Sequence, residues 1–311
     1  MQILVSGSLA YDRIMDFPGR FSDHILPDKI HILNVCFVVD SLNEKFGGTA
    51  GNIAYSLALL GERPVILATA GIDFERYEVW LRRHNLPLSG IRHIEDELTA
   101  GAYIITDRAN NQITGFNPGA MKHPSLQEFG EEYPQQTIAI IGPGNVEDML
   151  NYSRSYKKLG IPYVFDPGQQ ISILSGEQLV EMITGSELLI SNDYELGMII
   201  KDTGMKKSEL LRRTKAIIST LGENGSLLSS PHEQVEIAAA KAQQVKDPTG
   251  AGDAYRAGLI KGMVMGKDLV HAAGMGSTCA SYAVEQYGTQ EHSFTQEEFW
   301  KRHSATFDDG R

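Results

Sequence analysis

The sequence predicts an α/β protein with a large domain built on a central, mostly parallel sheet and with a small β-sheet lid. Three observations lead to this prediction. From residue 137 onward, short apolar runs alternate with helical segments, as expected of repeated β-α-β units. Two earlier segments, 16–46 and 97–117, contain runs rich in β-forming residues. Late in the chain, a glycine-rich loop at residues 247–252 leads directly into a helical pattern.

The first strand is expected at residues 3–6, a short apolar run that ends at Gly7. Asp12 follows soon after the carboxyl end of this strand, which is where open α/β sheets bind ligands. Asp12 is therefore a candidate ligand-binding residue. The alternative is that its carboxylate only caps a turn.

A glycine-rich stretch at residues 47–51 precedes a helix that we expect to end at Gly61. Glycines such as Gly47 and Gly48 allow the backbone to approach a ligand closely. Asn52, at the front of this helix, can both donate and accept hydrogen bonds, which suits a polyol. Packing alone also explains a double glycine before a helix, so the pattern becomes informative only in combination with other motifs.

The lid is predicted from two excursions without helical periodicity. In the first, residues 29–35 partly alternate and residues 37–39 are β-formers, so two strands are expected. In the second, a turn containing Asn110 and Asn111 joins two further strands. The alternative is that these strands are edges of the main sheet. The expected division is a large domain of residues 1–15, 47–96 and 118–311 and a lid of residues 16–46 and 97–117.

Strands and helices alternate regularly in the second half of the chain. A helix is expected at residues 146–159, where Gly160 would stop it. Asn192 and Glu195 follow one expected strand, and residues 220–225 follow the next. Each group has a plain alternative, a capped helix start for the first and a hairpin turn for the second. The strands are expected at residues 137–141, 161–165, 188–191, 216–220 and 226–229.

The loop at residues 247–252 predicts an anion site. Its small residues leave the amides at the start of the following helix pointing outward, with the positive end of the helix dipole behind them. A phosphoryl group in transfer is the anion that such a site suits best. Asp253 would repel a phosphate that is merely bound, but it would be useful for steering a hydroxyl group and taking its proton. The sequence therefore predicts a kinase that acts on a small alcohol.

Composition argues against several other classes of protein. The 311 residues include 28 Lys and Arg against 39 Asp and Glu, a net charge of −11, which disfavours nucleic acid as a partner. No apolar run is long enough to cross a bilayer, so no membrane association is expected. The two cysteines, Cys36 and Cys279, form no disulfide framework, and a reduced cytoplasmic setting is expected.

The two glycine-rich stretches resemble the signatures of the ribokinase-like (PfkB) family of sugar and nucleoside kinases. Residues 47–52 (GGTAGN) resemble the first signature and residues 247–258 (DPTGAGDAYRAG) the second. The resemblance covers essentially the whole chain, and residues 7–27 and 111–121 are similar to the bacterial adenosine and nucleoside kinase branch. It implies a three-layer α/β/α domain with a β lid, and ATP-dependent phosphorylation of the 5′-hydroxyl of a nucleoside, with adenosine foremost.

The resemblance also implies roles for individual residues. The family's catalytic aspartate and anion hole match Asp253, Gly250, Ala251 and Gly252. Its acceptor site matches Asp12, Gly47, Gly48 and Asn52. Its ATP site matches Asn192, Thr220, Gly222 and Gly225, while Glu195 matches a residue that arranges Mg²⁺ through water. Some relatives bind a monovalent cation near the positions of Asp247 and Thr249.

Three functions remain open at this point. An adenosine or nucleoside kinase needs an aromatic slot for a base, whereas a ribokinase- or fructokinase-like sugar kinase needs more polar groups there. Aromatic residues in the lid segments could form that slot or the lid's own core: Phe17, Phe37, Phe46, Tyr103 and Phe116. A non-catalytic nucleotide sensor is the third candidate, but it would not need Asp253. The expected partners are ATP, a nucleoside or sugar, and a second copy of the chain bound through the lid.

Overall fold

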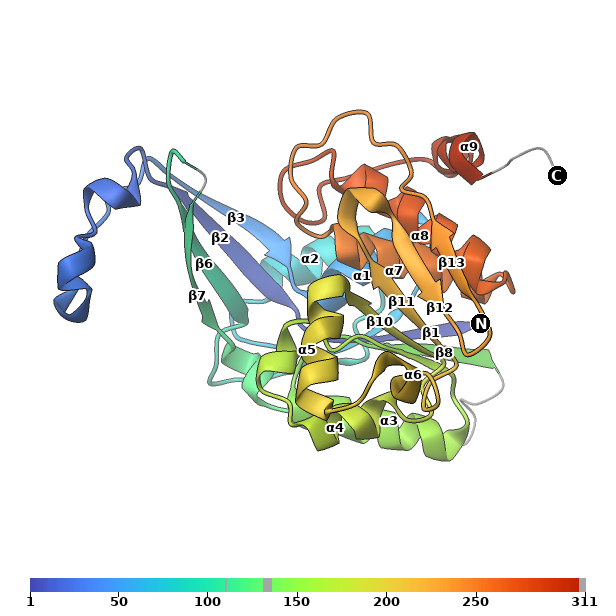
Figure 1. Ribbon diagram of the computed structural model, residues 1–311. Coiled ribbons are helices and arrows are strands. Elements are labelled where there is room, and N and C mark those ends of the chain that lie inside the picture. Colours follow the sequence, from blue (N-terminus) through green and yellow to red (C-terminus); the bar gives the residue numbers. More distant parts are fainter. Residues whose placement is uncertain (110, 131–135, 308–311) are drawn as a thin grey trace.

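The computed structural model describes residues 1–109, 111–130 and 136–307. Within these residues the strands form a sheet of nine strands and a separate sheet of four. Helices cover both faces of the large sheet, and the small sheet projects from one side of it (Figure 1). The predicted α/β fold with a mostly parallel sheet and a separate small sheet is confirmed, and the lid segments do not extend the main sheet.

The large sheet is parallel except at one edge, where β12 and β13 are antiparallel to their neighbours. The chain moves outward from β1 in both directions, so the order of strands switches beside β1. In open α/β sheets, ligands bind at the carboxyl ends of the strands next to such a switch. The strand order is β13 (Gln234–Ile237), β12 (Ser226–Ser229), β11 (Ala216–Thr220), β10 (Leu188–Asn192), β9 (Tyr163–Phe165), β8 (Thr137–Ile141), β1 (Gln2–Ser6), β4 (Val65–Ala70) and β5 (Ile91–His93).

Two apolar cores lie on opposite faces of the large sheet. Successive side chains of a strand point to opposite faces, and in β1 Val5 belongs to one core and Leu4 to the other. The core of Val5 contains residues of α1 (Thr49–Leu59), α2 (Glu75–Arg83), α7 (Ala251–Val264) and α8 (Leu269–Ala283). The core of Leu4 contains residues of α3 (Val146–Leu159), α4 (Gly176–Ile183), α5 (Asp193–Thr203) and α6 (Lys207–Leu210). Helix α9 (Gln296–Phe307) packs on α8.

Local sequence signals explain where helices begin and end. The side chain of Asn145 accepts hydrogen bonds from the first turn of α3, and Gly160 adopts a left-handed conformation with φ of 71° at the end of that helix. The predicted helix at residues 146–159 is confirmed. None of the described helices is long and apolar enough to cross a membrane.

The small sheet has the order β3 (Ser41–Gly47), β2 (Ala10–Asp16), β6 (Ala100–Thr106) and β7 (Gln112–Asn117). The strands predicted at residues 29–35 and 37–39 are wrong, because Pro27–Ile32 form 3₁₀ turns and residues 33–39 have no regular structure. The turn predicted at Asn110 and Asn111 lies partly outside the described residues. The segment between β2 and β3 extends away from the rest of the molecule (Figure 1).

Strand β2 begins at Ala10, before the lid boundary predicted at residue 16. It follows β1 after a short connection, so the first strand of the large sheet leads almost directly into the small one. The division of the chain into a large domain and a lid remains a proposal. The connection matters for function because residues of β2 are carried to the carboxyl edge of the large sheet.

Candidate active site

The start of α7 is formed by the predicted anion loop. Gly250 has a left-handed φ of 77°, and no side-chain hydrogen bond caps the helix there. The first amides of a helix lack partners within it. Here the amide of Ala251 donates to the carbonyl oxygen of Pro248 over 3.2 Å, so the amides of Gly252 and Asp253 are the ones left to face a ligand. Gly252 is exposed, and Ala251 and Asp253 are half-buried. This part of the chain is therefore open to solvent and able to receive an anion.

Asp253 is joined to the other glycine-rich stretch by a hydrogen bond. The amide nitrogen Nδ2 of Asn52, in α1, donates to Oδ2 of Asp253 over 2.8 Å. Burial raises the pKa of Asp253 to about 6, although the hydrogen bond from Asn52 and the charge of Arg256 act in the opposite direction. Two predicted site residues separated by about 200 positions are thus brought into contact.

Asp12 approaches the same place from the small sheet. Gly47 lies directly against its carboxylate, since any Cβ at residue 47 would overlap it. Burial raises the pKa of Asp12 to about 6, and a hydrogen bond with Thr289 lowers it in part. The negative charge of Asp12 also raises the pKa of Asp253. The structure therefore brings together two carboxylates that both resist ionisation.

The backbone at Gly48 explains why no larger residue stands there. Its φ is 87°, and a Cβ would lie 2.6 Å from the carbonyl oxygen of Ser8 and 2.7 Å from the backbone nitrogen of Ala10. The double glycine lets the end of β3 pass close to the connection between β1 and β2. Packing thus accounts for Gly48, while Gly47 makes room for Asp12.

Gln290 is part of this site and was missed in the sequence. Its Nε2 donates to Oδ1 of Asn52 over 3.0 Å, and its Oε1 accepts from Nε1 of Trp80 over 2.9 Å. These bonds direct the oxygen of the Asn52 amide toward Gln290 and the nitrogen toward Asp253. Gln290 is buried and has a left-handed φ of 59°. A lone glutamine near the end of the chain carries no sequence signal of such a role.

The predicted ATP-site residues lie at the carboxyl edge of β10 and β11. Asn192 and Thr220 are paired in register at the ends of these strands. Gly222 and Gly225 belong to the turn that joins β11 to the antiparallel β12, as the hairpin alternative expected. A Cβ at Gly225 would clash with the backbone of β13 and its extension, so glycine is required there for packing.

Asn192 and Glu195 form a capping box at the start of α5. Oδ1 of Asn192 accepts from the amide of Glu195 over 2.7 Å, and Oε2 of Glu195 accepts from the amide of Asn192 over 2.8 Å. The plain alternative, a capped helix start, is therefore the local structure. Burial raises the pKa of Glu195, with a smaller contribution from the charge of Asp166.

A buried ion pair lies between the two halves of the site. The guanidinium of Arg256, in α7, bonds to both carboxylate oxygens of Asp166, which follows β9. The side chains are only 8% and 3% exposed. The charge of Arg256 also interacts with those of Asp253 and Glu195. The sequence showed Asp166 and Arg256 beside motifs but gave no sign that they meet.

Asp247 and Thr249 hold the loop that precedes α7. Oδ1 of Asp247 accepts from both the amide and the hydroxyl of Thr249, and Oδ2 accepts from the amide of Gly288 over 2.8 Å. Burial acts in the opposite direction, but these hydrogen bonds lower the pKa of Asp247. The carboxylate is therefore ionised and ties the anion loop to the segment that contains Thr289 and Gln290.

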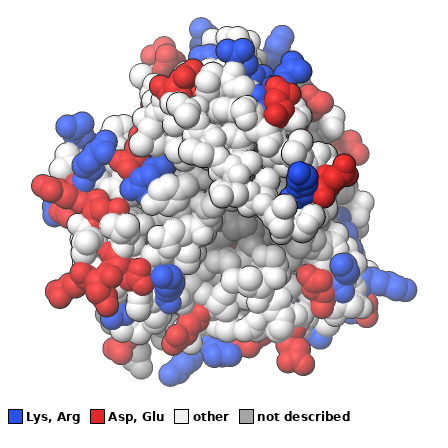
Figure 2. Space-filling view, turned by 90° about the vertical axis from the view of Figure 1, so that its left-hand side faces the viewer, with Lys and Arg blue, Asp and Glu red and all other residues white. Residues whose placement is uncertain are grey.

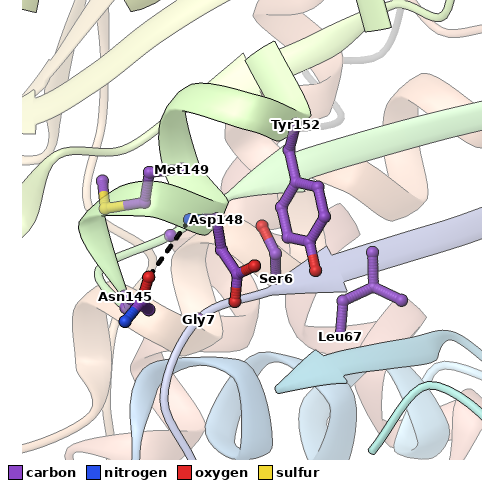
Figure 3. Close-up of a pocket in the computed structure, with 9 residues that line it drawn as sticks. Ser6, Gly7, Leu67, Asn145, Asp148, Met149 and Tyr152 are labelled. Carbon is purple, nitrogen blue, oxygen red and sulfur yellow. Dashed lines mark hydrogen bonds between the residues drawn. The ribbon is translucent and has the colours of Figure 1, made fainter. Parts of the chain in front are cut away.

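The protein has a small pocket and a broader surface hollow. A small pocket beside Gly7 is bordered by Ser6 and by Asp148 and Tyr152 of α3 (Figure 3), and its volume of about 10 Å³ suits a single water molecule rather than a substrate. On the side of the molecule that carries the lid, the surface is hollowed near its centre, and Lys, Arg, Asp and Glu lie mostly toward the periphery (Figure 2).

The five aromatic residues of the lid segments do not gather into a single slot for a base. Phe17 and Phe37 pack against each other with ring centres 4.8 Å apart and also contact Phe21, so they form the lid's own core. Phe46 stacks on Trp80 beneath the site. Tyr103 and Phe116 remain partly exposed.

A doubly wound sheet with an open helix start, a carboxylate at that start and a lid defines a phosphotransferase that acts on a hydroxyl group. The comparison with known proteins agrees: residues 22–296 match the pfkB family of carbohydrate kinases. The chain belongs to this family, as the two glycine-rich signatures predicted.

The similar proteins include nucleoside kinases. The chain is 35% identical over 260 residues to the nucleoside kinase of Methanocaldococcus jannaschii, covering 83% of this chain and 85% of the relative. A solved structure of a nucleoside kinase from that organism, described as an archaeal member of the ribokinase family, is similar with a TM-score of 0.87 and 31% identity, covering 98% of this chain and 99% of the other. The predicted ribokinase-like fold is confirmed.

A second solved relative is the nucleoside kinase of Burkholderia thailandensis. Its complex with inosine is 35% identical to this chain, with a TM-score of 0.87 and coverage of 98% of each chain. Its complex with ADP-inosine is 36% identical, with a TM-score of 0.85 and coverage of 98% of this chain and 96% of the other.

Proposed function

We propose that this protein is a nucleoside kinase that transfers the γ-phosphoryl group of ATP to the 5′-hydroxyl of a nucleoside, with adenosine the first candidate. The observation that carries the proposal is the contact of Asp253 with Asn52 at the open start of α7, beside Asp12. This places a carboxylate next to amides suited to an anion and next to polar groups suited to an alcohol. The relatives from M. jannaschii and B. thailandensis support a nucleoside as that alcohol.

The register of the small sheet supports a nucleoside over a simple sugar. Residues paired across neighbouring strands point to the same face, and Asp12 pairs with Ala102, which pairs with Phe116. A carboxylate and a half-exposed aromatic ring therefore share one face of the sheet, with only a methyl group between them. We propose that Asp12 binds the ribose hydroxyls with Gly47, Gly48 and Asn52 around them, while Phe116 contacts the base.

Phosphoryl transfer needs a donor-rich anion site and a group that aligns the attacking oxygen. The loop of Gly250, Ala251 and Gly252 would stabilise the charge that spreads over the phosphoryl oxygens, through the amides at the start of α7. Asp253 would orient the hydroxyl and accept its proton late, because a carboxylate is too weak a base to form an alkoxide beforehand. The lid would exclude water, which otherwise competes as the acceptor.

The nucleotide would lie along the carboxyl edge of β10 and β11. Asn192 and Thr220 end neighbouring strands there, and Gly222 and Gly225 belong to the turn that follows. The charge of Glu195 interacts with those of Asp166 and Arg256. Mg²⁺ binds phosphates and keeps several waters, so a single nearby carboxylate such as Glu195 fits its needs. It would neutralise charge on the phosphates. A monovalent cation beside Asp247 and Thr249 fits the ionised state of Asp247.

The remaining expectations are kept as proposals. A sugar kinase is the second candidate, because solved ribokinases share the fold. A non-catalytic sensor would have no use for the carboxylate of Asp253. The cysteines are free, with Cys36 exposed and Cys279 buried, which is compatible with the proposed cytoplasmic location.

The test is ATP consumption by the purified protein with a panel of nucleosides and sugars in the presence of Mg²⁺. We expect turnover with adenosine, and with other nucleosides if the site is broad. The product should be the 5′-monophosphate. In the Phe116→Ala variant, the KM for adenosine should rise about tenfold while kcat changes little, since loss of a stacking contact weakens binding. Turnover of ribose or fructose with none of any nucleoside would refute the nucleoside assignment.

A further inference from the structure

The ion pair of Arg256 and Asp166 is the one buried charged cluster in the described site to which no role has yet been given. Nη2 of Arg256 donates to Oδ1 of Asp166 over 2.8 Å, and Nε donates to Oδ2. The third nitrogen, Nη1, donates to the carbonyl oxygen of Gly252 over 2.9 Å. One planar guanidinium therefore connects the end of β9 to the first turn of α7.

This contact restrains one peptide unit of the anion loop. A trans peptide unit is planar, so the carbonyl of Gly252 and the N–H of Asp253 point in opposite directions. Gly252 lies in the first turn of α7, so helix geometry points its carbonyl toward the next turn and the N–H of Asp253 out of the helix start. The hydrogen bond from Arg256 adds a side-chain contact that holds this carbonyl in place. The N–H of Asp253 therefore faces the place where an anion would bind.

Asp166, at the β9 side of this contact, is buried and hydrogen-bonded to the neighbouring strand. Asp166 is 2% exposed, and its amide donates to the carbonyl of Ile141 at the end of β8 over 2.9 Å. Asp166 therefore connects the central strands to α7, through its amide on one side and its carboxylate on the other. A buried ion pair adds little net stability compared with a well-packed apolar pair, so stability alone is a poor explanation for it.

We propose that Arg256 and Asp166 are positioning residues for phosphoryl transfer: they hold the peptide between Gly252 and Asp253 in register with the edge of the central sheet. The inference rests on the proposed function, since it assigns the pair to the anion loop of that reaction. Neither side chain needs to touch the substrate. Both act through the backbone of residues 252 and 253.

Three variants separate positioning from simple stabilisation. Arg256→Met leaves the Asp166 carboxylate buried without its partner, so it should lower both Tm and kcat. Asp166→Leu combined with Arg256→Met removes both charges, so Tm should return toward that of the wild type. If the pair positions the loop, kcat of the double variant stays at least about tenfold low, because loss of one preorganised donor costs that much or more. Recovery of kcat together with Tm would overturn the proposal.

Arg256→Lys provides a variant that retains the charge. Its single ammonium cannot bond to both Asp166 and Gly252 as the planar guanidinium of arginine does. The kcat should therefore fall about tenfold, while the KM for the nucleoside changes less than about threefold. Wild-type kcat in this variant would also overturn the proposal. The matched control is Lys261→Met, which removes an ion pair with Glu62 from the other end of α7. It should lower Tm without lowering kcat.

Calorimetry with ADP, Mg²⁺ and aluminium fluoride keeps this inference separate from the identity of the acceptor. The wild type should bind ADP more tightly when aluminium fluoride is present, because that ion mimics a phosphoryl group in transfer. In Arg256→Lys, the increase in ADP affinity caused by aluminium fluoride should be about tenfold smaller than in the wild type, while the affinity for ADP alone stays the same. A wild type without nucleoside turnover would refute the proposed function, whereas an undiminished gain in Arg256→Lys would refute the role of the pair.

Discussion

At the scale of single residues, Asp253 shows that the site is arranged at the expense of stability. Its side chain is half-buried near Asp12 and Asp166, and this burial raises its pKa from 3.8 to about 6. A raised pKa means that the protonated carboxyl stabilises the fold below pH 3.8 and that this contribution is lost as the pH rises through about 6. At pH 7.5 the native state therefore carries the full cost of the ionised group.

Asp253→Asn should accordingly lose activity and gain stability. We expect kcat to fall at least about 10²-fold, since the group that orients the hydroxyl and takes its proton is gone. The free energy of unfolding at pH 7.5 should rise on the order of 1–2 kcal/mol, and the gain should disappear by pH 4 because the wild-type carboxyl is then protonated. Thermal unfolding at both pH values measures this, with the exposed Asp28→Asn as control. A variant less stable at pH 7.5 would contradict the expected cost.

Residues of the site were predictable where a local motif carries them. Asp253 and Asn52 stand in glycine-rich stretches whose spacing indicates their chemistry. Gln290 and the pair of Asp166 and Arg256 were not predictable in the same way. Their significance comes only from contacts across 238 and 90 positions of the chain, which no local pattern encodes.

At the scale of elements, two capping boxes in the same protein separate the structural role of Glu195 from its charge. Helix α5 begins with Asn192 and Glu195, whereas α4 begins with the same arrangement of Ser175 and the neutral Gln178. An amide oxygen therefore serves the box as well as a carboxylate oxygen does. The charge of Glu195 is not needed for the cap, and it costs desolvation, as the raised pKa shows.

Glu195→Gln should keep the helix cap and lose the function of the charge. Tm should stay within about 2 °C of the wild type, because the hydrogen bond to the amide of Asn192 is retained. The Mg²⁺ concentration needed for half-maximal activity should rise several-fold if Glu195 arranges the metal. Glu195→Ala is the comparison that removes both the charge and the capping hydrogen bond. It should also lower the free energy of unfolding by about 1 kcal/mol. An unchanged Mg²⁺ dependence would leave Glu195 with the capping role alone.

The same scale shows why some strands were predicted and others were missed. Buried strands of the large sheet, such as β8 and β11, are short apolar runs. Their regular alternation with helical segments makes a strand the expected structure for each of them. Strand β3 is mostly polar, and its Leu42 is exposed, so it lacks the alternation that burial of one face imposes. Its pairing with β2 is set by tertiary structure. The aliphatic residues at 29–39 led to a wrong prediction of strands, because an apolar run predicts a strand only if it is buried, and most of these side chains are exposed.

At the scale of the whole molecule, the segment between β2 and β3 is the feature least explained by a monomer. It extends from the lid away from the large domain (Figure 1) and is secured at its base by the rings of Phe17, Phe21 and Phe37. Beyond that cluster its aliphatic side chains are in solvent, Ile30 being 63% and Val38 78% exposed. Contiguous exposed apolar side chains of this kind mark interaction surfaces.

The homodimer expected through the lid would bury these side chains, and the segment provides its test. Ile30→Asp with Ile32→Asp should convert a dimer of the wild type into a monomer, because two desolvated carboxylates per copy would oppose association. Light scattering over a hundredfold range of concentration measures the mass. The matched control is Ile173→Asp, which changes an isoleucine of similar exposure in the large domain and should leave the mass unaltered. A wild type that is monomeric throughout that range would rule out the dimer, and the exposed segment would then need another partner.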